Sequence, residues 1–357
     1  MPSGHAFSPD WASAPGDTIA DLLRERHLTV VEFAERMGHT PEAVTDLLQG
    51  RATITIGVAR QLERVLGASV EFWMSRDFQY REDIARLHEV DEGWLTQLPV
   101  GDMIRFGWLE EVPHPSDEMA ACLRFFDVPN VQAWRRKYAN LPEMAVFRTS
   151  PSFDSRPAAV AAWLRQGEIE SEAINCRRWD PGRFEVLLSG IRSLTRQKNP
   201  NRFVPELRDL CAEVGVAVAV VRAPNGCRAS GATRFVSPNK ALLLLSFRHL
   251  SDDQFWFSFF HEAGHLLLHG VRGFFLEGFD APTTKEEEEA NQFAAHTLVP
   301  PEYQQRLLNL PVDSRKVIRF ARAIGISPGV VVGQLQHYGR IKHRQLNSLK
   351  RRFTWED

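Results

Sequence analysis

Two histidines and one glutamate in a short apolar stretch have the types and spacing needed for metal-dependent hydrolysis. His261, Glu262 and His265 form the pattern H-E-x-x-H within the apolar residues 255–268. On a helix, residues four positions apart lie on one face, so both imidazoles can bind one ion while Glu262 lies beside its open coordination position. The metal lowers the pKa of a bound water, and a carboxylate takes the proton as the water attacks a carbonyl. The pattern is therefore typical of a metallopeptidase.

A buried helix is predicted to carry this motif. Ser251 followed three residues later by Gln254 has the form of a capping box, which predicts that a helix begins there. Because the helix is apolar on nearly every side, we expect it to lie inside the protein. Polar side chains in such a place are costly unless they are paired or bind metal. The alternative interpretation is a pair of hydrogen-bonded core histidines.

A catalytic zinc ion needs a third protein ligand, which must come from farther along the chain. The metzincin spacing requires histidine at position 271, which is Val271, so that subclass is excluded. His269 continues the same helical face, but it lies about 12 Å along the helix axis from His261, too far to share one ion. We therefore expect a supporting or structural role for His269.

The residues 285–295 predict a second helix that can supply this ligand. Glu287 and Asn291 are one helical turn apart, so Glu287 can bind the metal while Asn291 holds one histidine in place. The choice of Glu287 rests on this spacing. The run contains three further glutamates, which are expected to be solvated at the positive end of the helix dipole: Glu286, Glu288 and Glu289.

Together these motifs resemble the ImmA/IrrE-type metallopeptidases. The resemblance rests on H-E-x-x-H, on the pattern from Glu287 and Asn291 to Phe293-Ala294-Ala295, and on the following Leu298-Val299-Pro300. It covers about residues 200–312 and includes two expected strands, 214–221 and 240–247.

The resemblance implies a zincin-like minimal domain with one Zn²⁺ per chain, and proteolysis of a helix-turn-helix repressor. By this resemblance His261, His265 and Glu287 are the metal ligands and Glu262 is the general base. Mn²⁺ could replace zinc, because ligand type alone does not fix the metal. Four residues are open candidates for stabilising the oxyanion: Arg248, His249, His296 and Tyr303.

The expected strand 240–247 leads directly into the metal-binding helix. An extended peptide can bind by adding a strand to the edge of a sheet, and this strand could offer such an edge. Residues 241–245 are apolar on both faces, however, which favours a covered core strand.

The N-terminal part of the chain predicts a helix-turn-helix. Five helices are expected, at 17–26, 30–37, 40–49, 55–66 and 69–76. Thr29 has the type and position of an N-cap, Gly38 marks a turn, and Thr40-Pro41 opens the third helix because Pro is favoured at the first helical position. The pattern resembles the XRE-type helix-turn-helix, and residues 15–73 are similar to HigA-type antitoxins.

By that resemblance, residues 40–49 form the recognition helix, which would lie in the major groove of operator DNA. The candidate DNA contacts are Thr40, Glu42, Thr45, Gln49 and Arg51. Residues 1–80 contain seven Arg, no Lys and eleven Asp or Glu, a net charge of −4. Because phosphate neutralisation dominates DNA affinity, such a domain should bind weakly or as a dimer, and we expect a homodimer across two half-sites. The alternative is a helix-turn-helix used for dimerisation or for holding a protein partner.

Four segments are expected along the 357 residues: a helix-turn-helix domain at 1–85, a helical linker domain at 86–195, the zincin-like domain at 196–312, and a basic helical segment at 313–357. The fold class is mainly α with a small β-sheet, α+β. The linker is predicted to contain helices at 117–126, 131–138, 156–168 and 183–195. Its tryptophans are expected to serve core packing, with a ligand-sensing pocket as the alternative.

The basic C-terminal segment has ten Lys or Arg and no acid between residues 314 and 355, and it could touch DNA phosphates or pack on the peptidase domain. Helices are expected to end near Gly325, near His337 and at 350–352.

Four cysteines show no C-x-x-C spacing, and neither a signal sequence nor an apolar run of membrane-spanning length is present. We therefore expect a cytoplasmic protein without a membrane partner.

The favoured function is a DNA-binding transcriptional regulator with zinc-dependent endopeptidase activity toward a specific regulatory protein: a repressor, a partner or another copy of this chain. The first alternative is a HigA-like antitoxin or repressor that binds a toxin and operator DNA through a chain whose peptidase domain is non-catalytic. The second is a metal-dependent sensor without chemistry. Glu262 argues against the sensor, because a structural zinc site is closed by a fourth ligand and needs no base.

Overall fold

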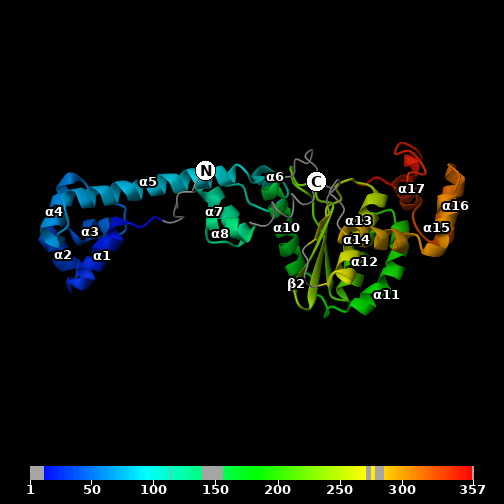
Figure 1. Cartoon of the computed structure of the whole chain (residues 1–357), viewed down its shortest axis with the longest axis horizontal. Coiled ribbons are helices and arrows are strands. Elements are labelled where there is room, and N and C mark those ends of the chain that lie inside the picture. Colours follow the sequence, from blue (N-terminus) through cyan, green and yellow to red (C-terminus); the bar gives the residue numbers. More distant parts are fainter. Residues whose placement is uncertain (1–11, 113, 139–155, 271–274, 278–284, 356–357) are drawn as a thin grey trace, which may run out of the picture. The chain divides into compact units, whose positions relative to one another are not determined.

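The computed structural model describes residues 12–112, 114–138, 156–270, 275–277 and 285–355 (Figure 1). The chain forms two compact units, residues 1–96 and 97–357. The predicted fold class is confirmed, because helices dominate and the second unit contains one small sheet. Within the described residues, no helix combines the length and the apolar character needed to cross a bilayer.

The first unit consists of five helices, as predicted: α1 (Pro15–Glu25), α2 (Val30–Met37), α3 (Pro41–Leu48), α4 (Ile56–Leu66) and α5 (Val70–Leu95). The side chains of Thr29, Thr40 and Thr55 each accept a hydrogen bond from a backbone N–H in the first turn of the helix that follows. Gly38 ends α2 with a φ of 70°, a conformation that glycine adopts without steric cost. These local signals fix the turn between α2 and α3.

The helix α5 is longer than predicted, since it continues to Leu95 instead of ending near Arg76. Neither proline nor glycine interrupts residues 70–92, and Arg81 pairs with the buried Asp77 one turn earlier at 2.9 Å. The boundary expected after residue 85 therefore falls inside a helix, and the compact units divide after Thr96.

The second unit is built around a four-stranded sheet with the order β1-β3-β2-β4. The strands are β1 (Val216–Val220), β2 (Gly231–Ser237), β3 (Lys240–Leu245) and β4 (Phe275–Glu277). β3 runs parallel to β1 and antiparallel to β2, and β4 pairs antiparallel with residues 231–233 of β2. The two predicted strands correspond to β1 and β3, whereas β2 and β4 were not predicted.

The strand β3 lies in the interior of the sheet, between β1 and β2. The hypothesis that a peptide could add to this strand is therefore wrong, and the favoured prediction of a covered core strand is confirmed. Leu243 and Leu245 belong to the same apolar core as the helix that follows, while Leu244 faces the opposite side of the sheet. Covering both faces explains why the strand is apolar throughout.

Helices cover both faces of this sheet, as Figure 1 shows. One face packs on α10 (Pro157–Glu172), and the other on α12 (Pro200–Ala212) and α13 (Asp252–Leu268), while α14 (Lys285–Leu298) packs against α13. Gly167 brings α10 close, since a Cβ built there would lie 2.5 Å from a methyl carbon of Leu244. The indole of Trp163 donates a hydrogen bond to the carbonyl of Val221 at 3.1 Å.

The predicted linker region contains α6 (Val100–Arg105), α7 (Pro115–Phe126), α8 (Val131–Lys137), α11 (Pro181–Ile191) and the 3-10 helix η1 (Arg192–Arg196). The rings of Trp134, Phe126 and Tyr138 pack together, which agrees with a packing role for the tryptophans. Apolar residues of α11 join the core around α13. The packing thus continues across the boundary expected after residue 195, because α11 buries its apolar face there.

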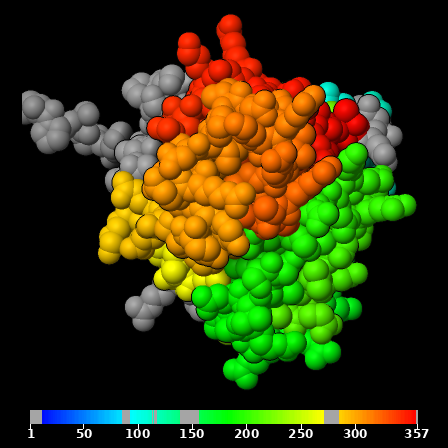
Figure 2. All heavy atoms as spheres, turned by 90° about the vertical axis from the view of Figure 1, so that its right-hand side faces the viewer, coloured from blue at the N-terminus to red at the C-terminus, as the bar shows by residue number. Residues whose placement is uncertain are grey.

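The C-terminal part contains α15 (Pro301–Leu308), α16 (Ser314–Ile324), α17 (Pro328–His337) and the 3-10 turn η3 (Asn347–Leu349). In Figure 2 these residues, orange to red, form one face of the unit beside green residues. Gly325 and Ser327 end α16 and cap α17, as predicted. The last helix, expected to end at 350–352, is absent: a single 3-10 turn stands there, followed by extended backbone.

Contacts at the beginning of α13 explain why no helix forms at residues 350–352. They also explain why the capping box predicted at Ser251 is not formed. Ser251 is the N-cap residue, but its side chain makes no capping hydrogen bond, so the capping box is absent. Instead, the backbone N–H of Arg351 donates to Asp252 Oδ1 at 2.9 Å, and Lys350 Nζ lies 2.5 Å from Asp253 Oδ2. Both aspartates are buried. Removing one partner of such a buried ion pair costs about 3–5 kcal/mol, so residues 350–352 anchor the helix instead of continuing one.

Candidate functional site

The helix α13 carries His261, Glu262 and His265, each with at most 1% of its surface exposed. Facing them, α14 presents the buried Glu287. The two helices approach closely at Gly264, where a Cβ would lie 3.3 Å from the Cα of Ala290. The small residue therefore brings a carboxylate within reach of both imidazoles.

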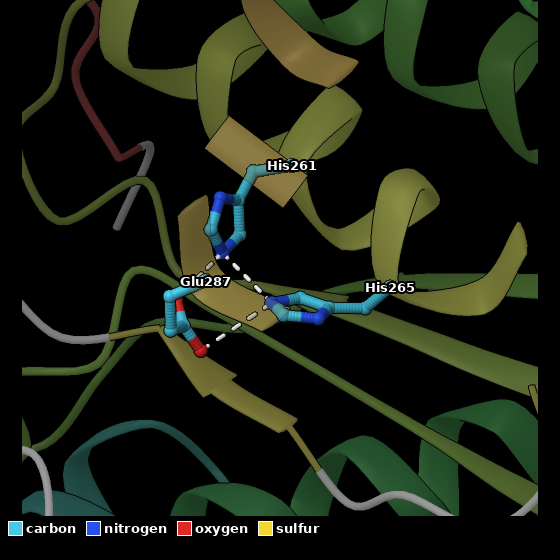
Figure 3. A group of neighbouring side chains, drawn as sticks. All are labelled: His261, His265 and Glu287. Atoms are coloured by element: carbon cyan, nitrogen blue, oxygen red, sulfur yellow. Dashed lines mark hydrogen bonds and ion pairs between the residues drawn. The ribbon is translucent and has the colours of Figure 1, made fainter. Parts of the chain in front are cut away.

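Figure 3 shows the side chains of His261, His265 and Glu287 pointing toward one another. Nε2 of His261 lies 3.2 Å from Oε2 of Glu287, and Nε2 of His265 lies 3.4 Å from Oε1. The two Nε2 atoms are 3.0 Å apart. One nitrogen or oxygen atom from each residue can be chosen so that all lie within 4.8 Å of one another.

This geometry fits a zinc ion. Donors about 2.0–2.1 Å from a tetrahedral zinc are separated from each other by roughly 3.3 Å, which matches the distances between these three side chains. Among the glutamates of the run, Glu287 is the one that reaches both histidines. Glu286 and Glu288 are exposed, and Glu289 contacts His269 instead. The structure thus brings together His261, His265 and Glu287, the three residues predicted from the sequence as ligands.

The other ring nitrogens of both histidines are held by neighbouring side chains. Nδ1 of His261 lies 3.0 Å from Oδ1 of Asn291, and Nδ1 of His265 lies 3.0 Å from Nδ1 of His269. An amide oxygen can only accept, so His261 carries its hydrogen on Nδ1 and keeps the Nε2 lone pair for a metal. Burial lowers the pKa of His265 to about 4, so this imidazole is also neutral at pH 7.

The carboxylate of Glu262 lies against the first residue of β2. A Cβ built at Gly231 would be 2.7 Å from both Cγ and Oε1 of Glu262, so only glycine leaves room for this side chain in its present position. Glu262 is fully buried and adjoins His261 in the sequence, so it is placed one step around the helix from the ligand face. A carboxylate there can take a proton from a molecule held at the metal.

Two of the four oxyanion candidates line a small pocket beside α13. Arg248 and His249 line it together with Ser230 and Ser258, and Ser258 lies one helical turn before Glu262. The guanidinium of Arg248 donates to a backbone carbonyl, and burial together with the charge of Arg248 lowers the pKa of His249. The other two candidates lie on the helices α14 and α15: His296 is partly buried, and Tyr303 packs against the apolar core.

The candidate DNA contacts lie on and beside α3. Glu42, Gln49 and Arg51 are exposed. Arg51 contacts Gln49 and pairs with Asp46 at 2.6 Å, so its side chain is held near the end of α3.

The two threonines among these candidates already serve the helix itself. Thr40 Oγ1 accepts from the backbone of Ala43, and the Thr45 hydroxyl donates to the carbonyl of Pro41. Thr40 is nevertheless exposed, like Glu42, Gln49 and Arg51, whereas Thr45 is partly buried.

Two contacts at the metal centre were not foreseen from the sequence. The sequence predicted a supporting role for His269 but did not indicate which residue it contacts. In the structure its Nε2 lies 3.1 Å from Oε2 of Glu289. The spacing offered a signal, since His269 follows His265 by one helical turn. No sequence signal indicated the contact between Gly231 and Glu262, because the strand β2 was not predicted.

Comparisons with known proteins match two separate segments of the chain. Residues 216–335 match the family model of the IrrE N-terminal-like domain, peptidase family M78, and residues 19–73 match a helix-turn-helix family model. The uncharacterized HTH-type transcriptional regulator YddM of Escherichia coli (strain K12) is 36% identical over 61 residues. This match covers 17% of the chain and 65% of the relative's length. The chain thus contains a helix-turn-helix domain joined to an IrrE N-terminal-like domain.

Proposed function

We propose that this chain is a DNA-binding transcriptional regulator whose second unit is a zinc-dependent endopeptidase with one specific regulatory protein as its substrate. One observation carries the peptidase assignment: His261, His265 and Glu287 converge within bonding range of one ion, beside the buried carboxylate of Glu262. The match to the M78 peptidase family supports the same assignment.

The side chains have separate tasks in this proposal. A zinc ion held by this site would polarise the scissile carbonyl and make a bound water more acidic. Glu262 is placed to accept a proton from a water held at the site and to deliver it to the leaving amine. His261, His265 and Glu287 hold the ion, and Asn291 fixes the ring of His261. The burial of His261, His265, Glu262 and Glu287 strengthens their electrostatic interactions, because little water screens them.

The cleavage proposal is tested by native mass spectrometry of the chain co-expressed with proteins encoded by neighbouring genes. We expect one zinc ion per chain and one partner, or another copy of the chain, cut at a defined bond. Removing the ion with a chelator should stop the cutting, and added zinc should restore it. A zinc-loaded chain in a stable complex with an uncut partner would contradict the peptidase proposal and favour the antitoxin alternative. The partner expressed alone is the control for other proteases.

DNA binding by the first unit is supported by the pair α2 and α3, joined at Gly38 as a helix-turn-helix, and by the match at residues 19–73. The name of the relative YddM describes an HTH-type transcriptional regulator. In this proposal α3 lies in the major groove, with Gln49 and Arg51 reaching base edges, and two copies bind two half-sites as a homodimer.

Replacing Arg51 with alanine is expected to weaken binding to operator DNA by about tenfold or more, because one good side-chain contact with a base contributes about 1–3 kcal/mol. Fluorescence anisotropy with DNA from the region upstream of the coding sequence measures this at fixed salt. Arg24→Ala on α1 is the matched control, since it removes the same charge elsewhere in the unit. Equal losses for both variants would show a general charge effect instead of a contact by α3.

A further inference from the structure

We propose that His269 and Glu289 form a hydrogen-bond relay that fixes the tautomer of His265 and raises the affinity of the site for its metal ion. The inference rests on the proposed metal centre and assigns two positioning residues to it. The relay runs from Glu289 Oε2 to His269 Nε2 at 3.1 Å, and from His269 Nδ1 to His265 Nδ1 at 3.0 Å.

With both imidazoles neutral, one arrangement of hydrogens satisfies both contacts of this relay. A carboxylate accepts only, so His269 must carry its hydrogen on Nε2 to donate to Glu289. A neutral imidazole then has a lone pair on Nδ1, and His269 can accept a hydrogen there. His265 must therefore carry its hydrogen on Nδ1, which leaves its Nε2 lone pair directed at Glu287 and the ion.

The fold holds the relay in place at the end of α13. The backbone N–H of His269 donates to the carbonyl of His265 at 3.1 Å, so the two residues are linked by the last turn of the helix. The side chain of His269 is only 10% exposed, and that of Glu289 is 41% exposed. Lys285, one turn before Glu289 on α14, lies 3.4 Å from its other carboxylate oxygen. The helix α14 thus contacts α13 through Glu289 as well as through Glu287.

The relay explains why His269 is not a ligand although it continues the ligand face. Its Nδ1 faces the Nδ1 edge of His265, whereas the ion is expected at the Nε2 edge of that ring. The two ligand histidines also differ in their support. His261 donates to the neutral amide of Asn291, while His265 donates into a chain that ends in a carboxylate. A hydrogen-bond relay that ends in a negatively charged carboxylate makes the imidazole of His265 more basic and therefore a stronger metal ligand.

The test is the affinity for Zn²⁺, measured by competition with a chromophoric chelator on the full chain. His269→Phe keeps a planar ring but removes the acceptor, and it is expected to weaken zinc binding about 10–100-fold. Glu289→Gln keeps an acceptor oxygen without its charge and should have a smaller effect, about tenfold or less. His269→Asn supplies an acceptor oxygen near the former Nδ1 and should recover part of the affinity. Glu288→Gln, a neighbouring exposed position, is the control and should bind as wild type does.

A second readout separates the relay from a general loss of structure. Thermal unfolding of the metal-free proteins should give nearly the same midpoint for wild type and Glu289→Gln, because a partly exposed carboxylate contributes little without the ion. Zinc binding by His269→Phe and Glu289→Gln at wild-type affinity would overturn the relay and leave the metal centre intact. A wild-type chain that binds no metal would overturn the metal centre, and the relay with it.

Discussion

Replacing Glu262 with glutamine is expected to lower the rate of partner cleavage by about 10²–10⁴-fold, while one metal ion stays bound to each chain. Glutamine has nearly the same shape, so it can occupy the space beside Gly231 that the carboxylate occupies now. It cannot take a proton from water at neutral pH. Since Glu262 is not one of the three residues that converge as ligands, the ion should remain in place.

Single-turnover cleavage and metal content, measured on the same preparation, check this prediction. Glu288→Gln is the matched control, because it makes the same chemical change at an exposed position on α14. Cleavage by Glu262→Gln at the wild-type rate would remove Glu262 from the proposed chemistry. Loss of the ion together with activity would instead assign the glutamate to metal binding.

Gly231→Ala is expected to reduce cleavage strongly, by on the order of 10²-fold, with little loss of stability. The added Cβ would lie 2.7 Å from Cγ and Oε1 of Glu262, so one of the two residues must shift. The glutamate side chain can rotate more easily than two paired strands can separate, and Gly231 pairs with both β3 and β4. The fold therefore survives while the carboxylate leaves its position.

The comparison is with Gly190→Ala on α11, where an added Cβ meets no atom within 4 Å. That substitution should keep full activity and gain up to about 1 kcal/mol of stability, because alanine favours a helix more than glycine does. Cleavage kinetics and thermal unfolding distinguish the two variants. Wild-type kinetics for Gly231→Ala would show that the close approach of β2 does not position Glu262.

The helix-turn-helix could be predicted in detail because its signals are local. Each of Thr29, Thr40 and Thr55 caps the helix that begins at the next residue, and Gly38 ends the helix just before it. Such signals act within three or four residues and need no knowledge of the tertiary fold. Local spacing likewise placed His261 and His265 on one turn, and the turn from Glu287 to Asn291 on the facing helix.

Features that depend on distant contacts could not be read in the same way. β2 has no regular alternation of apolar residues, and it becomes a strand by pairing with β3. Helix α12 was not predicted, and it contains Pro205, a residue that ordinarily argues against a helix interior. At Ser251 the local signal was misleading: the start of α13 is satisfied by residues about a hundred positions away, so no capping box is needed.

The anchoring of α13 also has a consequence for the order in which the parts of the chain can fold. Arg351 and Asp252 are 99 positions apart, so the ribosome completes α13 well before its anchor exists. Until then Asp252 and Asp253 lack the backbone donor and the ammonium group that compensate their burial, and water is their better environment. The first turn of α13 therefore gains this compensation only after translation has passed residue 351.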